Sequence, residues 1–206
     1  SYLLIYGNLG NNENQNLPKI DTFKDLIRKN ANIHEDMKRF FDGFPLSAHP
    51  MAILSSMVTA LSAFDPDSDA HDLDTIDLNI AKLIAKVKTI AAYSYRKFNG
   101  LPFIYPDQDL NYVENFLHMM FSDSQEEYHA DPVLVDALNL LLILHADHEQ
   151  NCSTSTVRLS GSSKSNIFGA ISSGISALWA QSTLQGLNSF EIMSKNIRFR
   201  YTNLFH

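Results

Sequence analysis

Cysteine is nearly absent from this chain of 206 residues, which contains Cys152 alone. An internal disulfide is therefore excluded, and we expect a reducing compartment, the cytoplasm. Long apolar runs are also missing, because the longest one, Leu138 to Leu144, is interrupted by Asn139 and is far shorter than the roughly 20 residues that span a bilayer. Residues 1–6 lack a basic start and a cleavage site, so we expect no membrane anchor and no secretion signal.

Positive charge is scarce as well. The chain has 16 Lys and Arg against 23 Asp and Glu, a formal net charge of −7. This balance argues against nucleic acid or an anionic membrane surface as the main partner. Apolar residues, in contrast, are abundant: 45% of the chain is hydrophobic and 19% is charged. Such a composition supports a packed core and excludes a disordered or fibrous chain.

Apolar residues recur mostly at helical spacing, and no alternating strand pattern repeats, which predicts an all-α protein. We expect helices over residues 21–41, 51–64, 76–97, 109–121, 131–149 and 166–179. Asp21 is a plausible N-cap, and Pro50 and Pro132 suit first turns. Residues 3–6 are expected to form a short strand or an extended arm, and residues 151–165 a loop or the start of a helix.

An acidic connector precedes the third expected helix. Its aspartates at 65, 67 and 69 alternate as at the start of a calcium-binding loop. However, Ala70 stands where that loop needs glycine, and Ile76 stands where it needs a bidentate glutamate. We therefore interpret the run as a solvated connector rather than as a metal site.

Chemically versatile side chains cluster at residues 145–151. His145 and His148 are three residues apart, so both project from one face of the last helical turn. The pattern leaves three interpretations open. The histidines hold a divalent metal with ligands from elsewhere, or they cap the helix by satisfying its last carbonyls, or they donate hydrogen bonds to an anionic metabolite.

Longer motifs surround this cluster. The string continues as His145-Ala-Asp-His148-Glu-Gln-Asn151-Cys-Ser-Thr-Ser-Thr-Val-Arg158. It is accompanied in chain order by Ala48-His49-Pro50-Met51, Pro102-Phe-Ile-Tyr105-Pro106, Asn115-Phe-Leu-His-Met-Met120 and Ser176-Ala-Leu-Trp179. Together the motifs closely resemble those of bacterial citrate synthases, and the resemblance extends from about residue 2 to residue 179.

The resemblance implies a multi-helical fold, an activity and a set of site residues. Citrate synthases are homodimers or higher homo-oligomers with a large and a small domain, and they condense acetyl-CoA with oxaloacetate in the tricarboxylic acid cycle. No metal or further cofactor is expected. The resemblance assigns oxaloacetate binding to His148 and Asn151, with His145 as a supporting residue. For Arg158 we expect a structural or salt-bridge role.

The family's catalytic groups have no counterpart in this sequence. They are a histidine in a Gly-Pro-x-His-Gly-Gly motif just after Ala-Leu-Trp, a histidine in a later Gly-His-Arg motif, a later aspartate, and arginines that clamp oxaloacetate. We therefore expect no catalytic residue in this chain, and no activity from the chain alone. Residues 1–179 are interpreted as an incomplete large domain and 180–206 as a divergent tail, with the small domain absent.

The tail has a specific explanation in the genetic code. Codons GGC CCA GTC CAC for Gly-Pro-Val-His, read one base late and followed by G, encode Ala-Gln-Ser-Thr, which is the sequence of residues 180–183. We hypothesise that the residues from Ala180 onward are out of frame. An unrelated natural terminus is the alternative.

Other features separate this sequence from its relatives. Asp65 and Asp69 stand where the family commonly has aromatic or apolar residues, so they would cost packing and desolvation if buried. Residues 30–32 replace the His-Thr-Met string of NADH-inhibited citrate synthases, so we expect no NADH control. Alternative functions are a methylcitrate synthase, which uses propionyl-CoA, and an inactive remnant or interaction protein that pairs with a full-length subunit.

Overall fold

The computed structural model describes residues 2–7, 19–70, 72–123, 128–146 and 152–179. Within these residues the regular structure is entirely helical, as predicted. The elements are α1 (Tyr2–Tyr6), α2 (Ile20–Lys29), α3 (Glu35–Lys38), η1 (Arg39–Gly43), α4 (Pro50–Leu61), η2 (Ser62–Phe64), α5 (Leu73–Phe98), α6 (Tyr112–Phe121), α7 (Pro132–Leu144), α8 (Cys152–Ser162) and α9 (Ile167–Leu178). No helix among the described residues is long and apolar enough to cross a membrane.

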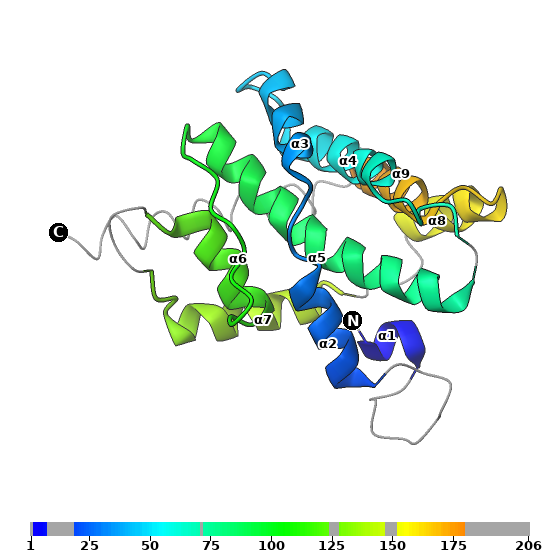
Figure 1. The fold of residues 1–206 in the computed structure, drawn as a ribbon, viewed down its shortest axis with the longest axis horizontal. Coiled ribbons are helices and arrows are strands. Elements are labelled where there is room, and N and C mark those ends of the chain that lie inside the picture. Colours follow the sequence, from blue (N-terminus) through cyan, green and yellow to red (C-terminus); the bar gives the residue numbers. More distant parts are fainter. Residues whose placement is uncertain (1, 8–18, 71, 124–127, 147–151, 180–206) are drawn as a thin grey trace.

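The long helix α5 lies at the centre of the arrangement (Figure 1). On one side of it α4 packs against α5 and α9, and α9 packs in turn against α8. On the other side α6 packs against α5, and α7 packs against α6. The short helix α1 lies close to α2, which contacts α5 (Figure 1).

The main core forms where α4, α5, α6 and α9 meet the segment that contains α3 and η1. Its fully buried side chains include Met37, Phe41, Met57, Ile90, Tyr93, Leu117 and Phe168. α4 is apolar on most sides, which is expected of an element enclosed by several neighbours. A smaller cluster joins Tyr2 of α1, Phe23 of α2 and Ala81 of α5.

The N-terminal segment differs from the sequence prediction, because residues 2–6 form a helix rather than a strand. In a helix, Tyr2 and Tyr6 lie on the same face, and their ring centroids are 4.7 Å apart. Both rings pack against Phe23, and the Tyr6 hydroxyl donates to the Asp77 carboxylate at 2.9 Å. These long-range contacts select the helix, and the local sequence does not reveal them.

The single helix predicted over residues 21–41 is also wrong, because α2 ends at Lys29 and α3 begins at Glu35. The Asn30 side chain donates to the Leu26 carbonyl at 2.8 Å and closes α2. The next residues are held by α5: the Thr89 hydroxyl donates to the Ala31 carbonyl, and Lys86 donates to the Asn32 carbonyl, both at 2.7 Å. The apolar spacing continues across the break, so it conceals the break in the sequence.

The acidic connector is only partly solvated. Asp69 is exposed, as expected, but the side chain of Asp65 is only 9% exposed and lies 2.7 Å from the Lys82 ammonium. The ion pair offsets the desolvation of the carboxylate that the sequence analysis anticipated. For Asp65 the solvated interpretation is therefore wrong.

Candidate functional site

α7 positions the first residue of the candidate site. Asp131 accepts a hydrogen bond from the Val133 amide at 2.9 Å, and Pro132 occupies the first turn. Val135 and Leu138 bury one face of the helix, which packs against α6. The helix ends at Leu144 rather than near residue 149, so His145 is its C-cap residue.

His145 forms hydrogen bonds with a carbonyl group in the last turn of α7. Its Nδ1 lies 2.7 Å from the Leu141 carbonyl oxygen, and its backbone amide donates to the same oxygen at 3.0 Å. This is the capping role that the sequence analysis left open. His148 and Asn151 lie outside the described residues. Among the described residues no group of three or more His, Cys, Asp or Glu side chains is placed to hold a metal ion.

α8 resumes the chain at Cys152, so the helix alternative for residues 151–165 is confirmed. α8 packs closely on α9, because a Cβ built on Gly174 would lie 2.5 Å from the Val157 Cγ2 atom. Arg158 is exposed, and it forms no ion pair with any residue that the structure describes.

The two described helices that flank the candidate site in the chain lie on different sides of α5. The chain leaves α7 on the α6 side of α5 and resumes in α8 on the α9 side (Figure 1). Residues 147–151, which connect the two helices, lie outside the described residues. The motif that carries the family resemblance thus begins at His145, at the end of α7, and continues from Cys152 to Arg158 in α8, on the other side of α5.

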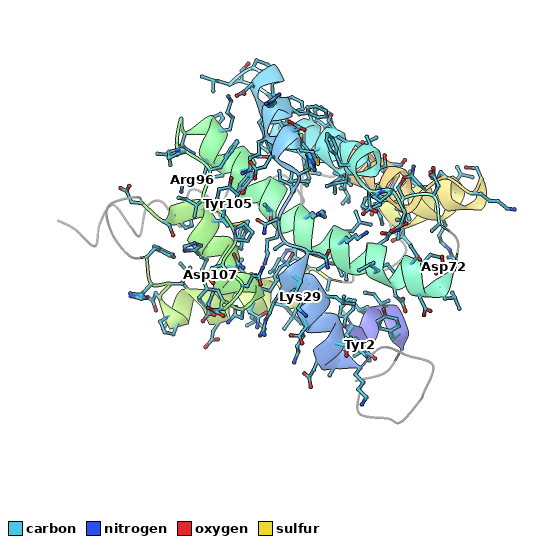
Figure 2. All side chains as sticks on the ribbon, viewed as in Figure 1. Tyr2, Lys29, Asp72, Arg96, Tyr105 and Asp107 are labelled. Atoms are coloured by element: carbon cyan, nitrogen blue, oxygen red, sulfur yellow. The ribbon has the colours of Figure 1, made fainter. Side chains whose placement is uncertain are left out.

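A buried arginine fixes the region beside α7. Arg96, labelled in Figure 2, belongs to α5 and is only 2% exposed. Its guanidinium donates to the carbonyls of Met120 at 3.0 Å and Ser122 at 2.9 Å, and also to that of Pro102. Burial lowers its pKa. The last carbonyls of α6 carry partial negative charge, which suits the guanidinium, and the charge of Asp123 opposes the effect of burial. Arg96 joins α5, α6 and the segment after α5.

His118 of α6 makes a second link to that segment. Its Nδ1 lies 2.7 Å from the Ser122 hydroxyl, and its ring also forms a hydrogen bond with the backbone of Tyr105. Burial is the main effect that lowers the pKa of His118, and the charge of Arg96 adds to it, while Asp107 and the Tyr105 hydrogen bond oppose it. The neutral ring is therefore favoured.

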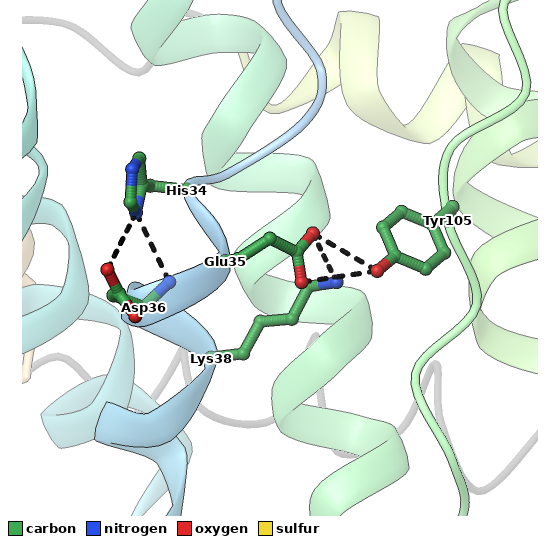
Figure 3. A network of polar contacts seen from close by, with 5 residues as sticks. All are labelled: His34, Glu35, Asp36, Lys38 and Tyr105. Atoms are coloured by element: carbon green, nitrogen blue, oxygen red, sulfur yellow. Dashed lines mark hydrogen bonds and ion pairs between the residues drawn. The ribbon is translucent and has the colours of Figure 1, made fainter.

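A polar network links α3 to Tyr105, in the segment between α5 and α6 (Figure 3). The Glu35 carboxylate accepts hydrogen bonds from the Lys38 ammonium at 3.0 Å and from the Tyr105 hydroxyl at 3.1 Å. The Lys38 ammonium also lies 3.6 Å from the centroid of the Tyr105 ring. The hydrogen bond from Lys38 is the main effect that lowers the pKa of Glu35. The sequence alone does not reveal this network, because Glu35 and Tyr105 lie 70 residues apart in the chain.

Two cavities lie elsewhere in the described part of the chain. One, of about 140 Å³, is lined by Leu110, Glu114, His118, Tyr128, His129 and Ala130. The other, of about 250 Å³, lies between α3, α4, α5 and α9, and its lining includes Asn32, His34, Asp65 and Lys86. His145 lines neither cavity.

Comparison with known proteins identifies the family. The family model described as citrate synthase, C-terminal domain, matches residues 1–193. The chain belongs to the citrate synthase family. It is 54% identical over 179 residues to Citrate synthase 1 of Mycobacterium tuberculosis, an alignment that covers 86% of this chain and 40% of the relative. The chain thus spans about 40% of the length of this curated relative.

Solved structures of citrate synthases share the fold. Citrate synthase from Pyrobaculum aerophilum matches with a TM-score of 0.75 and 30% identity, over 88% of this chain and 45% of the other. Citrate synthase from Thermoplasma acidophilum, in a ternary complex with carboxymethyl coenzyme A and oxaloacetate, matches with a TM-score of 0.73 and 25% identity, over 87% and 44% of the two chains. The predicted family and fold class are therefore confirmed.

Proposed function

We propose that this chain is the oxaloacetate-binding part of a citrate synthase, an acyltransferase that condenses acetyl-CoA with oxaloacetate to give citrate and CoA. The observation that carries the proposal is the identity of more than half of 179 aligned residues to a named citrate synthase. The two ligands named for the Thermoplasma acidophilum complex support the substrate pair. The proposal needs no cofactor beyond these substrates.

Oxaloacetate binding is proposed for His148 and Asn151. A ketone is activated when a hydrogen-bond donor polarises its oxygen, and imidazole and amide N–H groups are suitable donors. For His145 we propose support rather than direct binding, because its Nδ1 is already engaged with the Leu141 carbonyl. α7 and α8 hold the two ends of this segment.

The chemistry needs more groups than these 206 residues offer. A base must remove a proton from the acetyl methyl group, and a donor must stabilise the enolate that forms. The resemblance places those groups in later motifs that this sequence lacks. We therefore propose that the chain alone does not condense the two substrates.

Resequencing the gene across the codons for residues 179–188 decides which protein to assay. If restoring the frame recovers Gly-Pro-x-His-Gly-Gly and the later motifs, we expect the restored protein to release CoA from acetyl-CoA only when oxaloacetate is present. In it, His148→Gln should raise the KM for oxaloacetate more than the KM for acetyl-CoA. His145→Gln is the matched control, with a smaller effect. A restored protein that releases no CoA contradicts the proposal.

The alternatives predict different results. A methylcitrate synthase would use propionyl-CoA in preference to acetyl-CoA in the same assay. A non-catalytic partner of an intact subunit is favoured by the exposed leucines near the end of α7. If the frame is not restored, this partner role predicts that the chain co-purifies with a full-length citrate synthase.

Two further properties are proposed from family membership. We propose a homodimer or a higher homo-oligomer, with α8 available for contacts because it has no buried residue and exposes Leu159. Light scattering on the purified protein measures this directly. We also propose a cytoplasmic location, which fits the single cysteine.

A further inference from the structure

Two helices begin at histidines, which we term the histidine caps. His34 precedes α3 and His49 precedes α4, both with extended backbone. In each case the ring Nδ1 accepts a hydrogen bond from the backbone amide two residues later, Asp36 or Met51, at 3.2 Å. Histidine is not among the usual capping residues. The other side-chain N-caps in the described residues are aspartate or asparagine, at positions 72, 111, 131 and 166.

This choice of residue matters because of protonation. An imidazole that takes up a proton loses its acceptor nitrogen, and free imidazole does so near pH 6.5, as a general rule. A protonated ring would present an N–H to another N–H. It would also place a positive charge at the positive end of the helix dipole. Asparagine and aspartate caps do not undergo this change near neutral pH.

Each cap also packs against an aromatic ring from another element. The His34 ring lies 5.0 Å from the ring of Phe64, in η2. The His49 ring is stacked on Trp179, at the C-cap of α9, with centroids 5.1 Å apart and an interplanar angle of 21°. The rings therefore connect the start of α3 to η2, and the start of α4 to the end of α9.

The charges around the two caps differ. On its own element His34 faces Asp36, whose carboxylate lies 3.7 Å from Nδ1, whereas the Glu35 side chain points away towards Tyr105 (Figure 3) and interacts with His34 only through its charge. From the connector and α5, Asp65 and Lys86 line the same cavity as His34, with Asp65 paired to Lys82. His49 contacts the Met51 amide and the Trp179 ring, and no charged side chain among the residues that the structure describes.

We propose that the histidine caps make the segment from α3 to the start of α4 sensitive to pH, holding it at neutral pH and loosening it on acidification. On protonation His34 exchanges its amide partner for the Asp36 carboxylate. No carboxylate of the described residues contacts His49, so its protonation is not compensated and the start of α4 is weakened more. This property does not depend on the reaction proposed above.

Tryptophan fluorescence tests the His49 cap, because Trp179 is the only tryptophan in the chain. We expect emission from the 206-residue protein to change between pH 8 and pH 5, as the ring stacked on Trp179 becomes charged. His49→Asn retains a capping side chain but does not titrate, so the change should disappear. His34→Asn is the matched control and should keep it. A pH-dependent change that persists in His49→Asn overturns the assignment.

Denaturant unfolding tests both caps together. Loss of one cap costs about 1 kcal/mol, so loss of the His49 cap should raise the unfolding equilibrium constant about fivefold between pH 8 and pH 5, relative to the double variant His34→Asn/His49→Asn, and His34 should add a smaller factor. All other side chains are the same in both proteins, so their contributions cancel in the comparison. An identical pH dependence in the two proteins contradicts the proposal.

Hydrogen exchange gives a test on the unaltered protein, should a variant not fold. Between pH 8 and pH 5 the protection factors of the Asp36 and Met51 amides should fall. The amide of Thr75, which donates to the aspartate cap of α5 at 2.9 Å, is the internal control and should keep its protection. Equal behaviour of the three amides overturns the proposal.

Discussion

The ammonium group of Lys88 lies 4.6 Å from the centroid of the Tyr112 ring, where α5 and α6 pack together. Lys88 is only 5% exposed, and no carboxylate of the described residues pairs with it. Burial lowers the pKa of Lys88 to about 8 and raises that of Tyr112 to about 12. The aromatic face thus offsets only part of the desolvation of the charge.

Replacing Lys88 with methionine should stabilise the protein at pH 7 by roughly 1–3 kcal/mol, because the fold then no longer buries a charge. The pKa is lower in the folded chain than in the unfolded chain. The unaltered protein should therefore gain stability as the pH rises from about 8 towards the ordinary lysine value of about 10.4. Urea unfolding at several pH values measures both effects.

The matched control is Lys24→Met, since Lys24 is an exposed lysine of α2. It should change the free energy of unfolding by no more than about 0.5 kcal/mol. A Lys88→Met protein that is less stable than the unaltered chain at pH 7 would show that the contact with Tyr112 outweighs the desolvation.

His118 predicts a dependence of the same sign as Lys88, but at the acid end of the pH range. Its pKa is lowered mainly by burial, so the unfolded chain binds a proton more readily than the folded chain. Stability should therefore be retained above about pH 6.5 and lost as the pH falls below it. His118→Gln should reduce this acid sensitivity, although it sacrifices hydrogen bonds at neutral pH. Urea unfolding of the two proteins between pH 8 and pH 5 measures the difference, and equal acid sensitivity would contradict this role of His118.

Most helices could be predicted from local signals, but the breaks and partners could not. Pro50 and Asn166 mark the starts of α4 and α9, and apolar spacing gives their extent. The break between α2 and α3 depends on Thr89, which lies 58 residues beyond Ala31 in the chain. Periodicity carries no information about such a contact.

The candidate site could be predicted from the sequence less completely than the helices. Capping by His145 was one of three interpretations that the sequence left open, and the structure shows the capping contact with the Leu141 carbonyl. Oxaloacetate binding by His148 and Asn151 rests on family resemblance alone and stays a prediction. The start of α6 was placed too early, although Asn111 and Glu114 carry the spacing of a capping box, which the structure contains.

Gly174 should tolerate no side chain where α9 meets α8. An added Cβ would lie 2.5 Å from the Val157 Cγ2 atom and 3.4 Å from the Ser153 carbonyl oxygen. Gly174→Ala should therefore destabilise the protein by roughly 1–3 kcal/mol, measured by thermal or urea unfolding. Val157→Ala in the same chain should recover part of the loss by removing the clashing methyl groups.

Gly161 of α8 is the matched glycine, since nothing lies within 4 Å of its added Cβ. Gly161→Ala should stabilise the helix by about 0.5–1 kcal/mol, because alanine has the higher helix propensity. If both alanine variants change stability equally, close packing between α8 and α9 is not the reason for glycine at position 174.

The end of α7 should limit the solubility of the chain. Ile143 and Leu144 are 64% and 60% exposed, and Leu140 to Leu142 are exposed beside them. A contiguous apolar patch of this kind promotes association. Ile143→Lys/Leu144→Lys should lower binding of a hydrophobic dye and raise the soluble fraction, with a change in unfolding free energy of no more than about 0.5 kcal/mol. Lysine also suits the last turn of a helix.

Leu138→Lys provides the contrast on the same helix, because Leu138 is only 2% exposed. Placing an ammonium group there buries an unpaired charge, and the protein should lose its cooperative unfolding transition. Comparing the two proteins by dye binding and circular dichroism separates surface apolarity from core packing. If the Ile143/Leu144 variant unfolds as readily as the Leu138 variant, those side chains are covered in solution, and α7 is packed on more than its α6 face.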